Sequence, residues 1–287
     1  MNNVYLKSKN SEKKSILKLI YLLIPFLVYG LYKNGILLYK NNYGNLISLF
    51  RLPLLITISL LISYFFSKYK KEKLVSYRLI LNIFISMITF PNTSILIYLV
   101  LIILLNILYT YKKLNIAALY MVIYSIINII ISKYSYLNIY ESSVKHSYSM
   151  LNILLGSGSG GISQTLLLYS IICLIYLSVK FEYKKYIPLT SFVTFYGLLF
   201  IYVIISKNFS YDLLFNNNVI FSFIFLNTIT IFTPYTKGGA YLYGIILGLF
   251  TFVCLFLDIN LGMYVVTTLL SLFYNHFDKF IIKNSKV

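Results

Sequence analysis

The sequence predicts an all-α polytopic membrane protein with about ten transmembrane helices, arranged as two inverted five-helix repeats. Three observations support this prediction. Hydrophobic residues make up 59% of the 287, and charged residues only 11%. Mean hydropathy is +0.81, and apolar runs of about 15 to 20 residues recur along the whole chain, which is typical of bilayer-spanning helices. A proline–threonine pattern also recurs half a chain apart, which suggests the repeat.

The apolar runs are separated by short polar segments. The first run follows "KSKNSEKK" and has no small-residue cleavage site behind it, so we expect a retained helix rather than a signal peptide. Several runs are short for a hydrocarbon core of about 30 Å, which indicates helices that are broken or shielded by neighbours. The expected spans are Leu17–Tyr32, Leu52–Ser67, Leu74–Phe90, Ser94–Thr110, Leu114–Ser132, Ile162–Val179, Ile187–Ser206, Val219–Thr233, Ala240–Leu257 and Ile259–Phe277.

The basic residues orient these spans. If both termini are cytoplasmic, 19 Lys and Arg residues fall on the cytoplasmic side and six on the other. This asymmetry agrees with the positive-inside rule and supports a multi-pass protein of the plasma or inner membrane. It also accounts for the net charge of +18, so we expect the lipid bilayer, and no nucleic acid, as the partner of these charges.

The repeat rests on two similar helix ends. "TFPNTS" closes the third span and "FTPYTKG" the eighth, so Pro91–Thr93 and Pro234–Thr236 lie 143 residues apart. Because five helices fall in each half, the second half must enter the membrane the opposite way round. We therefore expect one membrane domain made of repeats 1–135 and 136–287, with ligand sites where interrupted helices meet. The alternative is that proline and threonine are ordinary punctuation at helix ends.

A glycine-rich stretch, "GSGSGGISQT" (156–165), precedes the sixth span. Its spacing matches a dinucleotide fingerprint, but that motif needs a strand before it and an acid about 20 residues on. The next acid here, Glu182, lies beyond a membrane-length helix. Glycines at a helix N-terminus instead suit a phosphate or the electron-rich edge of a flavin; the alternative is a flexible loop with close helix packing. The candidate residues are Gly158, Gly160, Gly161, Ser163, Gln164 and Thr165.

Five stretches together resemble a known family. They are "LIPFLVYGLYKNGI", "SMITFPNTSILIYLVLIIL", "LNIAAL", "GSGSGGISQTLLLYSIICLIYL" and "NTITIFTPYTKGGAYLYGIILGLFTFV". In order, and over most of the chain, they are similar to the membrane subunits called D in the Rnf electron-transport complex and B in the sodium-pumping NADH–quinone reductase. The last stretch is the most specific of the five.

This resemblance implies a flavin, FMN or riboflavin, bound at the membrane. It also implies partnership with other membrane redox subunits and with an extracytoplasmic flavoprotein. The family attaches FMN through the threonine of a Ser-Gly-Ala-Thr motif between its fifth and sixth helices, but this chain has no threonine between Thr110 and Thr165. We therefore expect non-covalent flavin. Further candidate ligands are Asn92, Thr93, Thr233, Thr236 and Lys237, the last of which is either a partner for a flavin phosphate or a positive-inside anchor.

The family's intramembrane acids are thinned out here. Ile229 stands where the family has an aspartate before Pro-x-Thr, Gln164 where it has a glutamate, and Leu261 near a third acid. Because carboxylates are the usual handles for protons and sodium, ion pumping is doubtful. Asp258 is the acid nearest the hydrocarbon, and is either a helix-capping residue or an ion handle.

No catalytic or metal-ligating constellation is expected. Cys173 and Cys254 lie in different spans and are too few for an iron–sulfur cluster, and His146 and His276 fall on opposite sides. The sequence thus predicts a non-catalytic membrane subunit of an oxidoreductase or translocase complex, relaying electrons across or along the membrane through bound flavin. The alternatives are an inverted-repeat transporter of a small solute or ion, and a scaffold subunit without a cofactor.

Overall fold

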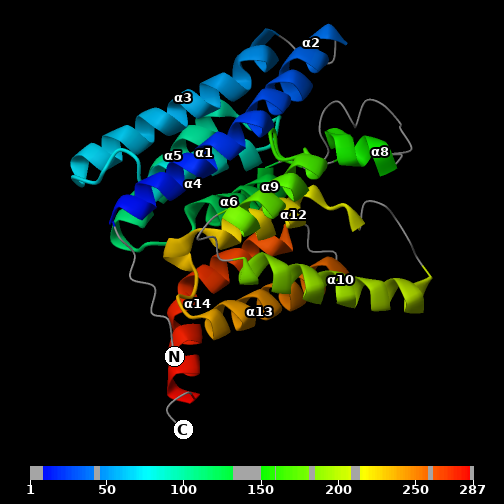
Figure 1. Ribbon diagram of the computed structural model, residues 1–287. Helices are drawn as coiled ribbons and strands as arrows, with labels where there is room; N and C mark the ends of the chain where they lie inside the picture. Colours follow the sequence, from blue (N-terminus) through cyan, green and yellow to red (C-terminus); the bar gives the residue numbers. More distant parts are fainter. Residues whose placement is uncertain are drawn as a thin grey trace.

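The computed structural model describes residues 9–41, 46–131, 150–158, 160–180, 185–207, 214–257 and 261–284. All regular structure in these ranges is helical (Figure 1), and four helices are long and apolar enough to cross a membrane. Shorter apolar helices lie between them. The prediction of an all-α polytopic membrane protein is therefore confirmed.

Each of the ten predicted runs contains one stretch of α-helix, and the eighth also contains two 3-10 segments. In the first half these are α1 (Lys9–Leu31), continued by η1 (Tyr32–Leu37) and α2 (Leu38–Lys40), then α3 (Leu46–Tyr69), α4 (Tyr77–Ile88), α5 (Ile95–Tyr111) and α6 (Ile116–Ile131). The short α8 (Met150–Asn152) and η2 (Ile153–Ser157) lead to α9 (Leu167–Lys180), α10 (Tyr186–Ser206), α12 (Asn217–Ile224), η3 (Leu226–Thr228), η4 (Thr230–Phe232), α13 (Lys237–Phe256) and α14 (Gly262–Asn284).

The first helix is longer than its predicted span. The helix does not end after Tyr32. It continues through the π-helical segment η1 and α2 and ends near Lys40. The side chain of Lys33, expected in an exposed loop, is only 2% exposed. Single π-helical turns inside α-helices are often found at functional sites, which directs attention to this segment.

Two short helices, α4 and α12, occupy the centre of the molecule and run antiparallel. The start of α4 meets the end of the α12 segment, where the hydroxyls of Tyr77 and Thr230 are hydrogen-bonded. Between these ends the ring of Phe84 lies 5.9 Å from that of Phe221 and 6.3 Å from that of Phe225. Two inverted halves would place their third helices in this way. The boundary between repeats 1–135 and 136–287 falls outside the described residues and stays a prediction.

The predicted eighth span is broken after Ile224, and buried polar side chains satisfy the backbone at the break. The amide of Asn227 donates to the carbonyl oxygen of Ser222 (3.1 Å) and to the hydroxyl of Thr267 (2.9 Å), and accepts from the hydroxyl of Tyr243 (3.2 Å). The amide of Asn115 donates to the carbonyl oxygen of Leu226 (3.1 Å). Because asparagine side chains compete with the backbone for hydrogen bonds, they stabilise a break that an apolar sequence would not form.

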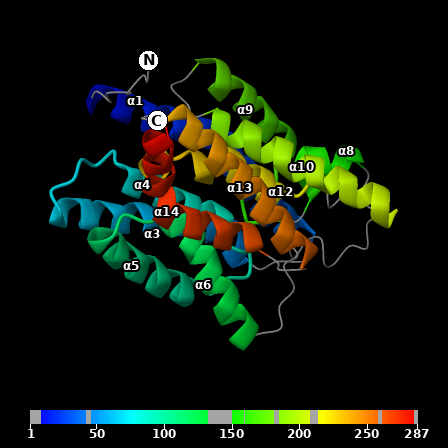
Figure 2. The same ribbon diagram turned by 90° about the horizontal axis from the view of Figure 1, so that it is seen from below.

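Helices α10 and α13 pack closely side by side (Figure 2). A Cβ atom added at Gly244 or Gly248 of α13 would collide with the hydroxyl of Thr190 or Thr194 of α10, respectively. This small-residue pattern lets the two backbones approach, as is common in membrane helix pairs.

The helix ends form two opposite faces of the bundle, and one of them is rich in lysine. The end of the first helical run lies against the start of α3, where Gly35 is next to Leu49, so α1 begins on the side where α3 ends. Ring contacts between Tyr186 and Tyr241 (4.9 Å) bring the starts of α10 and α13 together. The exposed lysines of this lysine-rich end are Lys13, Lys14, Lys18, Lys68, Lys70, Lys71, Lys73, Lys112, Lys113, Lys185, Lys237 and Lys279.

Candidate functional site

The glycine-rich stretch lies across the C-terminal end of α4. The last carbonyl groups of a helix have no partner within it, and here residues from the second half supply two. The N–H of Ile162 donates to the carbonyl oxygen of Thr89 (2.9 Å), and that of Ser163 to the carbonyl oxygen of Met87 (3.0 Å). A Cβ atom at Gly161 would lie 2.5 Å from the carbonyl oxygen of Ile88. Close backbone packing therefore accounts for this glycine without a ligand.

The start of the stretch is held by Lys33 of η1. Its buried Nζ donates to the carbonyl oxygens of Gly156 (2.7 Å) and Gly158 (3.1 Å). Gly156 has φ +107°, a conformation that favours glycine, and it ends the π-helical segment η2 against the ring of Tyr29. Two π-helical segments, one from each half of the chain, are thus joined at this point.

Asn34, the next residue of η1, binds the middle of the stretch. Its Nδ2 donates to the carbonyl oxygen of Ile162 (2.7 Å), while its Oδ1 is buried without a hydrogen-bond partner. One helical turn earlier, Gly30 leaves room for the side chain of Ser163, which any Cβ atom there would overlap. The first helix is therefore shaped to receive this segment.

Arg51, in the first turns of α3, anchors the "TFPNTS" turn. Its guanidinium donates to the carbonyl oxygen of Pro91 through Nη1 and to that of Thr93 through Nη2 (2.9 Å). Thr93 is buried and Asn92 is exposed on the surface of the turn. The positive charge of Arg51 thus lies at the end of α4, where the helix dipole is negative.

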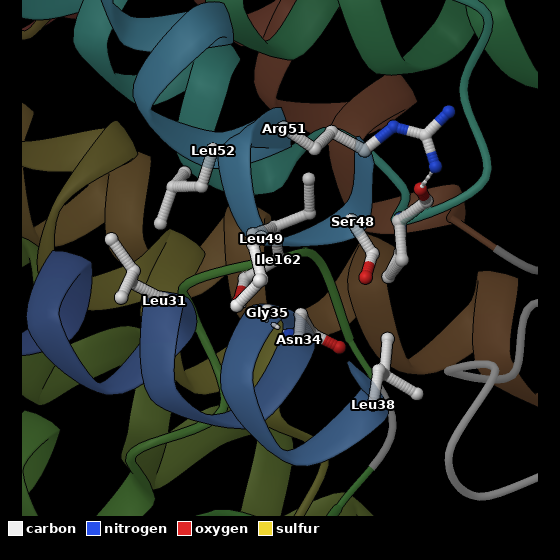
Figure 3. Close-up of a pocket in the computed structure, with 10 residues that line it drawn as sticks. Leu31, Asn34, Gly35, Leu38, Ser48, Leu49, Arg51, Leu52 and Ile162 are labelled. Carbon is white, nitrogen blue, oxygen red and sulfur yellow. Dashed lines mark hydrogen bonds between the residues drawn. The ribbon is translucent and has the colours of Figure 1, made fainter. Parts of the chain in front are cut away.

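A pocket opens where these segments meet (Figure 3). Leucine side chains form its apolar walls, while Asn34, Ser48 and Arg51 supply polar groups. Its free space holds about one water molecule, which is far less than a flavin ring requires. The lining residues are Leu31, Asn34, Gly35, Leu38, Ser48, Leu49, Arg51, Leu52, Pro91 and Ile162.

The end of the stretch binds the second half of the molecule. Gln164 is fully buried; its Nε2 donates to Oδ1 of Asn218 at the start of α12, and its Oε1 accepts from the hydroxyl of Tyr264 (3.2 Å). Both polar atoms of the amide are thus used within the protein. The glycine-rich stretch joins α4, α12 and α14 at one end of the bundle.

Several buried polar atoms around the stretch have no hydrogen-bond partner. They are Asn34 Oδ1, Arg51 Nε, Ser163 Oγ and Thr165 Oγ1. Ser163 and Thr165 are at most 1% exposed. Burying a polar group without a partner costs about 1–3 kcal/mol, so a group of such atoms needs an explanation, such as a ligand or an ordered water.

The other predicted ligands lie at the opposite end of α12. The carboxylate of Asp278, near the end of α14, accepts from the N–H groups of Tyr235 (2.8 Å) and Thr236 (2.9 Å) and from the hydroxyl of Thr236 (2.7 Å). Thr233 is buried beside this turn, and Lys237 is exposed at the start of α13. Asp278 therefore holds this turn as Arg51 holds the other.

The structure brings together one part of the predicted site. Asn92 and Thr93 share the end of α4 with Gly158, Gly160, Gly161, Ser163, Gln164 and Thr165. Thr233, Thr236 and Lys237 form a second place across the bundle, and Asp258 lies outside the described residues. Whether any of them binds a cofactor stays a prediction.

Sequence reasoning missed Lys33, Asn34, Arg51 and Asp278. From the sequence, Lys33 and Arg51 count only among the six basic residues of the other side, Asn34 has no role, and Asp278 directly follows the last expected span. Two signals were available: a lysine–asparagine–glycine triplet directly after an apolar run, and an arginine at the start of another. Placing charged or amide side chains close to the hydrocarbon costs free energy, so such side chains tend to have hydrogen-bonding or charge partners within the protein.

Comparison with protein families identifies the family of this chain. The sequence profile of the NQR2, RnfD, RnfE family matches residues 111–285, which is more than half of the chain. No curated protein matches the chain. The matched region contains the glycine-rich stretch, including Gly156 and Gly158, whose carbonyl groups Lys33 binds. It also contains the turn held by Asp278.

Proposed function

Because the chain belongs to the NQR2, RnfD, RnfE family, we propose that it is the integral-membrane subunit of a flavin-based electron-transport complex of the Rnf or Nqr type. Family membership implies a membrane complex with other subunits. The proposed role is to relay electrons across or along the membrane, between other membrane redox subunits and an extracytoplasmic flavoprotein. A bound flavin, FMN or riboflavin, would accept and pass on the electrons.

The observation that carries this proposal is the group of unpaired buried atoms at the end of α4. Asn34 Oδ1 is an acceptor and Arg51 Nε a donor, and both residues line the same pocket. The hydroxyls of Ser163 and Thr165 lie just before the N-terminus of α9, where the helix dipole favours negative charge. This donor and acceptor set suits the polar edge of a flavin or its phosphate.

The polar groups of the pocket suit a flavin, but the pocket is too small to hold one as it stands. The free space holds about one water molecule, so a ring would enter only if η1 and α3 moved apart. Asn34 and Arg51 are the polar residues of the pocket that would hold the flavin. Sequence supports non-covalent binding, because no threonine lies between Thr110 and Thr165.

The proposed orientation places both termini and the lysine-rich end in the cytoplasm of a plasma or inner membrane, in agreement with the positive-inside rule. The glycine-rich stretch then lies toward the extracytoplasmic side, beside Lys33 and Arg51. Ion pumping is not part of the proposal, because the sequence lacks the carboxylates at the positions of Ile229 and Gln164.

One observation favours a second candidate function. Two short helices, α4 and α12, run antiparallel at the centre of the bundle, the α12 segment is broken after Ile224, and secondary transporters bind their solutes at such helix breaks. A transporter of a small solute or ion would show uptake in vesicles that contain only this chain. A scaffold subunit would show neither uptake nor bound flavin.

The first test is the absorption spectrum of the detergent-purified protein, followed by denaturation and filtration. We expect a flavin spectrum in the folded protein and the flavin in the filtrate. Flavin that stays on the denatured chain would contradict non-covalent binding. A folded protein with no flavin, in a membrane that supplies it, would favour the transporter or the scaffold.

A sharper test uses the unpaired hydroxyl of Thr165. If flavin binds there, Thr165→Val lowers the flavin content several-fold, because one hydrogen bond to a buried ligand is lost. If no ligand binds there, the same change raises the melting temperature, because a buried unpaired hydroxyl is removed. Thr251→Val is the matched control, since Thr251 Oγ1 is also buried and unpaired but belongs to α13. It should leave the flavin content unchanged.

A further inference from the structure

Two neighbouring loops at the lysine-rich end carry a cluster of lysines. The α3–α4 loop and the α5–α6 loop meet where Nζ of Lys70 lies 5.4 Å from the ring centre of Tyr69 and 5.9 Å from that of Tyr111. All lysines of these loops are exposed. We call them the lysine cluster, which consists of Lys68, Lys70, Lys71, Lys73, Lys112 and Lys113.

Glu72, the acid within these loops, is neutralised by the buried side chain of Arg78. Oε2 of Glu72 accepts from Nε of Arg78 (3.0 Å), and Oε1 of Glu72 accepts from Nη2 (3.2 Å). Arg78 is fully buried between the rings of Phe66 and Tyr109, whose centres lie 5.6 and 4.7 Å from its guanidinium carbon. The carboxylate is therefore paired with a buried charge, and the lysines above it keep their positive field.

The backbone of the α3–α4 loop is fixed. Helix α3 ends in a Schellman motif, in which the N–H of Glu72 donates to the carbonyl oxygen of Ser67 (2.9 Å) and that of Lys71 to the carbonyl oxygen of Lys68 (3.2 Å). Lys71 takes the left-handed position with φ 53°, where glycine is the usual residue.

We propose that the lysine cluster binds the phosphate groups of anionic phospholipids at the membrane surface. Tyr69 and Tyr111 are 78% and 85% exposed and flank the cluster, as aromatic residues do at the level of lipid headgroups. Directly below them, Phe65 and Leu108 turn apolar side chains outward, which suits acyl chains. Lipid phosphates and acyl chains together match this combination of charged and apolar surface, whereas an acidic soluble protein would leave the apolar part uncovered.

The test measures thermal unfolding of the purified protein in neutral detergent with added phosphatidylglycerol or phosphatidylcholine of the same acyl chains. We expect half-maximal stabilisation at an at least tenfold lower concentration of phosphatidylglycerol. Replacing four cluster lysines by glutamine should remove about tenfold or more of that preference, and replacing them by arginine should preserve it. The changed residues are Lys68, Lys70, Lys71 and Lys112.

A control variant separates a specific site from general positive charge. It carries glutamine at four other lysines of the same end and should keep the preference within about threefold. These are Lys13, Lys14, Lys18 and Lys185. Equal losses in the two glutamine variants would overturn the proposal, because they would show that only overall charge matters.

Two further outcomes would also overturn it. One is stabilisation by inorganic phosphate or polyglutamate to the same degree as by phosphatidylglycerol, since the surface would then recognise a free anion or an acidic chain. The other is a binding measurement at different salt concentrations on the unaltered protein, so it still tests the proposal if the glutamine variants fail to insert into the membrane. Raising NaCl from about 50 to 500 mM should weaken phosphatidylglycerol binding roughly tenfold, and the absence of a salt effect would exclude ionic recognition.

Discussion

The two turns that follow the central helices share a Pro-x-Thr pattern but are held by opposite charges. Arg51 donates to the carbonyl oxygens of Pro91 and Thr93, whereas Asp278 accepts from the N–H groups of Tyr235 and Thr236. The first turn continues the negative end of α4, and the second begins the positive end of α13. The pattern directly precedes a long helix in both halves, α5 or α13, but Arg51 binds it at the C-terminus of α4 and Asp278 binds it at the N-terminus of α13.

The two turns also differ in whether all of their polar atoms have hydrogen-bond partners. At the second, the hydroxyl of Thr236 donates to Asp278 and accepts from the N–H of Gly239, which is an ordinary helix cap. At the first, Asn34 Oδ1, Arg51 Nε and Ser163 Oγ lack partners beside a pocket. The turn at α4 thus keeps unpaired polar atoms beside a pocket, whereas the turn at α13 is closed by the protein itself.

The largest loss of stability is expected for Gly161→Val, which disrupts the packing of the glycine-rich stretch against the end of α4. The added Cβ would meet the backbone of Ile88 at 2.5 Å, and backbone cannot move aside easily. We expect a loss of about 3 kcal/mol or failure to fold. Size-exclusion chromatography and thermal unfolding would measure it. Gly197→Ala is the control, because a Cβ there has open space; equal damage in both variants would contradict the packing described for Gly161.

A smaller effect is expected for Arg51→Met. Two carbonyl groups lose their donor, and we expect a cost of about 2 kcal/mol. The loss should be local, so hydrogen exchange should accelerate at the amide of Thr93 but not at that of Thr236. Equal acceleration at both turns would show that they are one cooperative unit rather than two independently held breaks.

The reciprocal change at the second turn is Asp278→Asn. It keeps the shape of the side chain but loses the charge that accepts three hydrogen bonds, and we expect a cost of about 1.5 kcal/mol. Exchange should now accelerate at Tyr235 and Thr236 while Thr93 stays protected. If flavin is bound, its content should be unchanged, since this turn is not part of the proposed site; a fall would place the cofactor between the turns.

The smallest effect is expected for Thr236→Val, which removes the side-chain cap of α13 and the hydroxyl's hydrogen bond to Asp278. The cost should be about 1 kcal/mol, the usual value for an N-cap threonine. Thr236→Ser should recover most of the stability, because the hydroxyl is retained. A Val variant as stable as the parent protein would show that Asp278 alone holds the turn.

Much of the fold could be predicted because its signals are local. Each apolar run contains a helix, and those lysines counted on the cytoplasmic side that the structure describes lie at one end of the bundle. The lengths of α4 and α12 could not be predicted in this way. Hydropathy continues past Ile224, and the helix ends there because Asn115, Asn227 and Thr267 supply hydrogen bonds from distant parts of the chain.

The candidate site was predictable only in part. The glycines and the Pro91 turn are visible as sequence patterns, but their contact joins residues that lie about 70 positions apart. Lys33 and Arg51 have the same apparent pattern as any basic residue next to a membrane span. Their roles follow from the carbonyl groups they meet, and a linear sequence does not contain that information.

By itself, the sequence determined the membrane class, the order of the helices that the structure describes and membership of the family, because hydropathy, charge asymmetry and short motifs are properties of neighbouring residues. Only the tertiary structure decided which helices break, which buried polar atoms remain unpaired and where a lysine cluster faces outward above a neutralised acid. The physical reason is that a buried hydrogen bond depends on two partners. In this protein the second partner usually comes from another helix.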